Sequence, residues 1–244
     1  SFSGSPTLVS MALVPGGSFS MSSAEADSRP PHQVKVSSFL MGKTEVTQDQ
    51  YRKVMGANPS VFGAEADAGA RPVENLSWFD AIAFCNALSE LEGFEKVYSI
   101  DGARVAADFS KSGYRLPTEA EWEFAARGGQ VGKGTAFAGA EDASKVAWYE
   151  ANSGGGTKPT ASLSPNELGL HDMSGNVWEW CWDWYGPFDG QPRSEPTGPA
   201  SGEAKAIRGG GWYNASAFSR IALGSAAKPE TKDLGIGFRV VRRR

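Results

Sequence analysis

The chain of 244 residues has little cysteine, little histidine and no excess of positive charge, and each shortage excludes a class of protein. Its two cysteines, Cys85 and Cys181, are too few for a disulfide framework, and we expect two unpaired core thiols. The 24 basic residues are outnumbered by 28 acidic ones, which argues against a nucleic-acid partner because phosphate binding needs a basic surface. No apolar run approaches the roughly 20 residues that span a bilayer, so no transmembrane segment is expected.

The abundant residue types indicate a folded, loop-rich protein. The 8 Trp, 13 Phe and 6 Tyr supply a large core and exclude disorder over most of the length. The 30 glycines and 14 prolines are many for a helical bundle and favour long loops. No internal repeat and no Gly/Ser linker divides the chain, so we expect a single domain over residues 1–244.

The local patterns mix strands with helices. Two short strands are expected within residues 8–21, and an alternating strand at residues 32–36. Three helices are predicted to begin after Thr47, Ser77 and Thr118, because each hydroxyl is followed three positions later by a Gln, Asp or Glu that can complete a capping box. Short strands interspersed with amphipathic helices predict an α+β fold.

The segment at residues 166–184 has the most specific pattern in the sequence. Four of its tryptophans alternate at period two, so a strand would place all four on one face. The turn at residues 172–175, followed by Glu179, brings carboxylate and backbone oxygens together, a mixture that calcium prefers. Asp172 and Glu179 could equally cap turns and accept from backbone N–H groups, and the residues alone leave both interpretations open.

Four parts of the sequence, in order, resemble the formylglycine-generating-enzyme-type sulfatase-modifying domain, a branch of the C-type lectin fold. They are residues 41–47, 114–123, 169–180, and 208–212 together with 237–239. The resemblance covers nearly the whole chain and implies one irregular α+β domain with long ordered loops and paired terminal strands. It also implies a structural calcium ion, held by the side chains of Asp172 and Glu179 and by backbone oxygens near Gly175 and Val177.

The residues with which this family performs chemistry are missing from the sequence. The resemblance implies copper binding through two cysteines, whose positions fall on about Asn214 and Ser219, and neither residue can supply a thiolate. A second catalytic branch binds iron through three histidines, whereas this chain has only His32 and His171. We therefore expect no copper, no iron and no catalytic residue. The alternative is a formylglycine-generating-enzyme-like oxidase or sulfatase-modifying accessory protein that lacks the copper-binding cysteines.

A fold that keeps its framework and lacks its reactive residues is typical of a binding module. Residues 212–239 resemble the variable region of proteins diversified by retroelements, where errors at adenines cannot produce Lys, Glu, Gln, Met or Trp at varied positions. None of these types occurs at residues 213–227, and the three that follow surround Pro229. The predicted varied, ligand-binding positions are Tyr213, Asn214, Ala215, Ala217, Phe218, Leu223, Ser225, Ala226, Ala227, Asp233, Leu234 and Gly235.

Tyr213, Phe218 and Leu223 are the expected anchors, because aromatic residues carry much of the binding energy of a typical interface. The expected framework residues within the same segment are Arg220, Ala222 and Ile236. The other interpretation is a plain non-catalytic relative in which the segment fills an ordinary loop, and it predicts that Tyr213 and Phe218 are buried.

The resemblance also carries expectations about partner and location. The partner is expected to be a protein or another macromolecule, which the sequence does not identify. Diversified binders of this kind are commonly displayed on bacterial surfaces, often as lipoproteins, so we expect a surface or extracytoplasmic location. The sequence begins at Ser1, and a lipid anchor would lie outside it.

Overall fold

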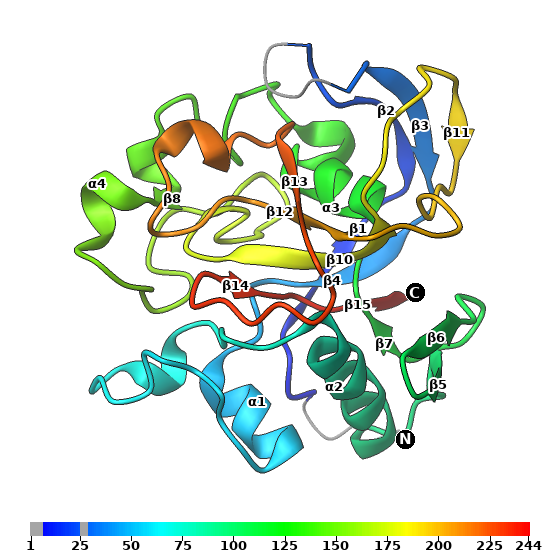
Figure 1. Cartoon of the computed structure of the whole chain (residues 1–244). Coiled ribbons are helices and arrows are strands. Elements are labelled where there is room, and N and C mark those ends of the chain that lie inside the picture. Colours follow the sequence, from blue (N-terminus) through cyan, green and yellow to red (C-terminus); the bar gives the residue numbers. More distant parts are fainter. Residues whose placement is uncertain (1–6, 25–28) are drawn as a thin grey trace, which may run out of the picture.

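The structure is a computed structural model that describes residues 7–24 and 29–244. Within these residues, short strands and helices are joined by long ordered loops (Figure 1). The predicted α+β class is confirmed. The described residues contain no helix that is both long enough and apolar enough to cross a membrane.

The helices begin where the capping boxes predict. They are α1 (Gln48–Met55), α2 (Trp78–Leu91), α3 (Glu119–Ala126) and α4 (Glu150–Ser153). Thr47, Ser77 and Thr118 each accept a hydrogen bond from the backbone N–H three residues on, and the side chain at that third position accepts from the cap's own N–H. The four-residue helix α4 is too short to show an apolar period and was not predicted.

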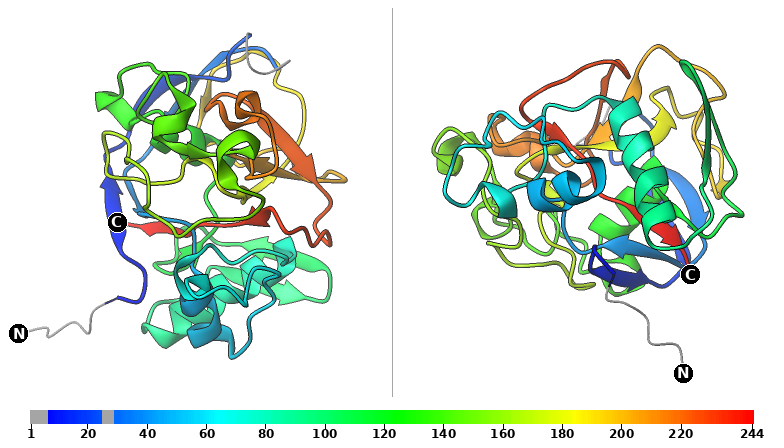
Figure 2. Two further views of the ribbon diagram at one scale, coloured as in Figure 1. Left: turned by 90° about the vertical axis from the view of Figure 1, so that its left-hand side faces the viewer. Right: turned by 90° about the horizontal axis from the view of Figure 1, so that it is seen from below.

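The two ends of the described chain meet in one sheet, with the order β1-β4-β15-β7. Its strands are β1 (Met11–Val14), β4 (Phe39–Gly42), β15 (Val241–Arg243) and β7 (Tyr114–Arg115). Strand β4 pairs antiparallel with both β1 and β15. The first and last strands therefore share a neighbour, whereas we expected them to pair with each other. Figure 2 shows the carboxyl end beside the amino-terminal strands.

A second sheet, with the order β13-β12-β10-β14, holds the predicted ligand-binding segment. Its strands are β10 (Trp178–Trp184), β12 (Lys205–Arg208), β13 (Gly224–Ala227) and β14 (Ile236–Gly237). Strand β12 pairs antiparallel with one side of β10, and β14 pairs parallel with the other side. The chain between β12 and β14 therefore leaves the sheet on one side of β10 and returns on the opposite side.

The remaining strands form three small sheets. They are β2 (Gly17–Met21), β3 (His32–Val36) and β11 (Arg193–Ser194) in one, β5 (Tyr98–Asp101) with β6 (Arg104–Ala107), and β8 (Ala147–Trp148) with β9 (Ser174–Gly175). Strands β1, β2 and β3 confirm the three strands expected near the amino end.

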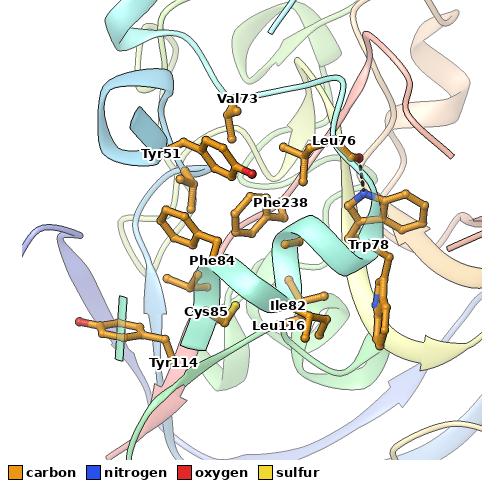
Figure 3. Close-up of a cluster of buried hydrophobic side chains, with 14 of the residues drawn as sticks. Tyr51, Val73, Leu76, Trp78, Ile82, Phe84, Cys85, Tyr114, Leu116 and Phe238 are labelled. Atoms are coloured by element: carbon orange, nitrogen blue, oxygen red, sulfur yellow. Dashed lines mark hydrogen bonds between the residues drawn. The ribbon is translucent and has the colours of Figure 1, made fainter. Parts of the chain in front are cut away.

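Strand β10 divides the core into two clusters. Trp178 and Trp180 pack with α2 in one cluster, where Tyr51 and Phe84 stack with ring centroids 5.4 Å apart (Figure 3). Cys181, on the other face of the strand, packs with α3 in the second cluster. The predicted alternation is confirmed, and both faces of this strand are covered because each one meets a helix.

The two cysteines are free and buried, as expected. They lie in different clusters, Cys85 on the helix α2 and Cys181 on the strand β10 beside α3. Burial raises the pKa of both thiols above the ordinary value, which disfavours the reactive thiolate.

Candidate functional site

The predicted ligand-binding segment follows β12 and begins with a tight glycine turn. Gly209 and Gly210 have φ angles of 100° and 77°, a region that favours glycine. A Cβ on Gly210 would lie 2.8 Å from the carbonyl oxygen of Phe218, so only glycine fits this close approach. The turn leads into a loop with the short helix η4 (Ser216–Ser219), then into β13, and finally through residues 228–235 into β14 (Figure 1).

Six of the predicted ligand-binding residues are exposed, and we call them the outward residues. They are Tyr213, Ala215, Ala217, Phe218, Ala226 and Leu234. The exposed fractions are 36% for Tyr213, 45% for Phe218 and 37% for Leu234. The interpretation in which Tyr213 and Phe218 are buried is therefore wrong.

Asn214 is turned toward the framework. Its Oδ1 accepts hydrogen bonds from the indole Nε1 of Trp178 at 2.8 Å and from the backbone N of Gly211 at 3.1 Å. Its carbonyl oxygen accepts from the backbone N of Glu150 at 2.9 Å, which ties the loop to α4. This geometry disfavours variation at Asn214, because a side chain without an acceptor oxygen at this place would leave two donors unpaired.

Asp233 and Gly235 also belong to the framework. Asp233 Oδ1 accepts from the Tyr213 hydroxyl at 3.0 Å and from the Gly235 N–H at 2.8 Å, and its carbonyl accepts from Asn75 N at 2.9 Å. Gly235 is buried, and a Cβ there would lie 2.1 Å from Cε1 of Tyr213. A side chain at position 235 therefore does not fit beside Tyr213 in its present place. Burial and then the negative charge of Asp233 raise the pKa of Tyr213.

The residues around β13 are half-buried. Leu223 and Ala227 pack against the core cluster around α2, so Leu223 is not the exposed anchor that was predicted. Ser225 is paired with Ile207 of β12 in the sheet. The expected framework residues Ala222 and Ile236 are buried, and Arg220 is half-buried.

An aromatic group beside the outward residues was not predicted. Phe62, in the loop after α1, meets Trp212 edge-on with ring centroids 5.4 Å apart, and Trp212 meets Tyr213 in the same way at 5.2 Å. The indole of Trp212 donates to the carbonyl of Leu234 at 3.1 Å. The adjacent Val61 is 58% exposed. The only signal in the sequence is an apolar pair in an otherwise polar loop, which does not reveal its neighbour more than 140 residues away.

The positions at which the family resemblance implies copper-binding cysteines lie on either side of η4. Asn214 bonds the framework as described, and Ser219 is fully buried with no hydrogen bond to its Oγ from any described residue. His32 and His171 each lie within 3.4 Å of a backbone carbonyl through Nδ1, at Pro30 and Leu163 respectively. Over residues 7–24 and 29–244, no three or more His, Cys, Asp or Glu side chains gather as they would around a metal ion.

The carboxylate of Glu179, a predicted calcium ligand, is engaged by other groups. Its Oε1 accepts from Nη2 of Arg239 at 2.6 Å, and its Oε2 accepts from Nε of Arg239 at 2.7 Å. The indole of Trp122 donates to the same Oε2 at 2.7 Å. Since Arg239 and Glu179 are both fully buried, the pair already neutralises the charge that calcium would need.

Asp172, the other predicted side-chain ligand of calcium, accepts from the backbone N of Ala161 at 2.7 Å. Gly175 pairs with Trp148 of the strand β8, and Val177 is fully buried. Burial, and then the negative charge of Asp172, raise the pKa of the neighbouring Glu45, which favours its protonated form. Asp172 and Glu179 thus bind N–H groups, the alternative that the sequence left open, and calcium binding stays a prediction.

Comparisons with known proteins agree with this arrangement. Residues 3–244 match the family described as sulfatase-modifying factor enzyme 1-like domain. The chain is 36% identical to the chaperone protein LppX of Paenibacillus barcinonensis, over 95% of this chain and 89% of that protein. It is 33% identical to the formylglycine-generating enzyme of Streptomyces coelicolor over 72% of this chain, and the match spans only 55% of that enzyme.

A solved structure is also similar over almost its whole length. Treponema denticola variable protein 1 superimposes with a TM-score of 0.90 at 34% identity, covering 96% of this chain and 95% of that one. Together with the family match, this similarity confirms the predicted fold, the formylglycine-generating-enzyme subtype of the C-type lectin fold.

Proposed function

The chain belongs to the sulfatase-modifying factor enzyme 1-like family, and we propose that it is a non-catalytic ligand-binding protein whose outward residues contact the ligand. The observation that carries the proposal is the exposure of Tyr213 and Phe218 on loops that are held by hydrogen bonds to the framework, such as the bond from Trp178 to Asn214. Loops that are ordered before binding lose less conformational entropy when a partner docks. Similarity to a protein named as variable supports the same role.

We further propose that the outward residues are diversified by a retroelement. All six belong to residue types that copying errors at adenines permit. Among them, Tyr213 contacts the framework, because its hydroxyl donates to Asp233 and its ring meets Trp212. The experiment is to sequence the gene and its neighbourhood in many isolates. We expect a reverse transcriptase, a near-copy of the codons for residues 212–239, and changes concentrated at the outward positions. Changes spread evenly over Asn214, Gly235 and the rest of the segment would contradict this proposal.

The alternative is an oxidase or a sulfatase-modifying accessory protein, as suggested by the similarity to the Streptomyces enzyme. It predicts a stoichiometric redox metal in the purified protein. Metal analysis after expression in medium supplied with copper and iron distinguishes the two functions. About one equivalent of either metal per chain would contradict the non-catalytic proposal.

We propose a bacterial surface or extracytoplasmic location, in keeping with the similarity to the Treponema variable protein. A surface location would let the outward residues meet macromolecules outside the cell. Protease treatment of intact cells that express the full-length gene, followed by detection of this domain, tests the proposal. Protection of the domain in intact cells and in cells with a permeabilised outer layer would contradict it.

A further inference from the structure

A cavity of about 330 Å³ lies beneath the loop of residues 186–199, within the size range of small-molecule sites. The loop that carries β11 is on the right in Figure 1, whereas the short helix of residues 216–219 is at the upper left. The cavity therefore lies away from that part of the proposed ligand-binding segment. Its apolar walls are formed by Met21, Trp184, Pro187, Phe188, Pro196 and Pro199.

Asp183 lines this cavity and is only 4% exposed. Its Oδ2 accepts a hydrogen bond from the backbone N of Glu119 at 2.9 Å. No Lys, Arg or His of the described residues forms a salt bridge with it, whereas the neighbouring Glu119 is paired with Arg29 at 2.6 Å. A buried carboxylate without a paired cation is costly, so the cavity contains an uncompensated acid.

Charged groups of both signs surround Asp183. Burial, and then the charge of Glu119, raise the pKa of Asp183, and Glu121 acts in the same direction. Lys205, from the strand β12, opposes this rise without forming an ion pair with the carboxylate. His32 also lines the cavity, at 4.6 Å between its ring centroid and that of Phe188.

We propose that this cavity binds a small organic ammonium ion whose nitrogen pairs with Asp183 and whose apolar body packs against Trp184, Phe188 and the prolines. The ring centroids of Trp184 and Phe188 already lie 3.7 Å from Nζ of Lys205 and 4.1 Å from Cζ of Arg29, so these rings supply apolar contact. The preference for a cation comes from the buried carboxylate, which has no paired cation among the described residues. An anion would face the carboxylate of Asp183, whereas Glu119 is already neutralised by Arg29 and Arg208. Arg193, at the cavity wall, is paired with Asp189 and leaves Asp183 without a paired cation. The proposal is independent of the function proposed for the outward residues.

The test uses 2-phenylethylammonium as the probe and isothermal titration calorimetry on the purified chain at neutral pH. Its neutral analogue 2-phenylethanol has the same apolar body without the charge. We expect the alcohol to bind roughly tenfold or more weakly than the ammonium, because it cannot pair with a buried carboxylate. In Asp183→Asn the affinity for the ammonium should fall by a similar factor. The control Asp101→Asn, which removes an exposed acid from β5, should keep the affinity within about twofold.

Asn at position 183 retains an oxygen that can accept from Glu119 N, so the variant is expected to fold, and its thermal melt checks this. If the variant does not fold, the comparison of ammonium with alcohol on the unchanged chain decides the matter. Equal binding of the two probes, no binding of the ammonium, or full binding by folded Asp183→Asn would overturn the proposal.

Discussion

Replacing Asn214 by alanine tests whether the ligand-binding loops are held in place before a ligand arrives. The substitution removes one oxygen that accepts from two donors, the indole of Trp178 and the backbone N–H of Gly211. Trp178 is only 4% exposed, so water cannot readily replace the lost acceptor. The fold of the rest of the chain should survive, because the core clusters are untouched.

The size of the effect follows from these contacts. A buried donor left without an acceptor costs about 1–3 kcal/mol, and the second hydrogen bond adds about 1 kcal/mol. We therefore expect Asn214→Ala to lower the free energy of unfolding by about 3 kcal/mol. For a chain of this size, 1 kcal/mol corresponds to about 2–4 °C, so the melting temperature should fall by about 6–12 °C.

The assay is thermal unfolding followed by tryptophan fluorescence, with two matched controls. Asn214→Asp keeps an oxygen acceptor at the same place and should retain most of the stability. Phe218→Ala removes an exposed side chain and should change the free energy of unfolding by less than about 0.5 kcal/mol. A melting temperature for Asn214→Ala equal to that of the parent would refute the reasoning, as would equal losses in the alanine and aspartate variants.

Three further outcomes are expected. Arg239→Met should lower the free energy of unfolding by about 3–5 kcal/mol in urea titrations, because it strands the buried Glu179, and a loss under about 1 kcal/mol would contradict the pairing. The raised pKa of Asp183 gives stability that is full below the ordinary pKa of an aspartate and is lost as pH rises through the folded-state pKa, so Asp183→Asn should gain stability relative to the parent as the pH rises above about 4. An unchanged or opposite difference would argue against that shift. Cys85 and Cys181 should resist a thiol reagent until the chain unfolds, and rapid labelling of the native protein would show that they are accessible.

The parts of the fold that could be predicted are those determined within a few residues. A capping box spans four positions, so Thr47, Ser77 and Thr118 identify their helices without knowledge of the rest of the chain. The tryptophan strand is similarly local, because its alternation is visible in seven residues. Even there, the sequence does not show the register shift between Trp180 and Trp184, since that depends on the partner strand β12.

The parts of the site that could not be predicted depend on distant contacts. Asn214 and Gly235 were predicted to vary because their residue types are among those that copying errors permit. In the structure, the side chain of Asn214 accepts from Trp178, and Gly235 has no room for a Cβ beside Tyr213. The sequence around Glu179 likewise does not show that its carboxylate meets an arginine 60 residues further along the chain. The permitted residue types limit which substitutions can arise at a position, whereas the packing around that position decides which of them the fold tolerates.

The two strands that flank β10 and hold the ends of the segment, β12 and β14, give the domain a use in protein engineering. Their separation is fixed by the sheet, so a foreign peptide inserted at the exposed residues 217–218, within the segment between these strands, would meet anchor points that do not move. Doubling the length of such a connection costs only about 0.6 kcal/mol in closure entropy when the insert is flexible. The domain could therefore serve as a recipient for grafted recognition peptides of different lengths.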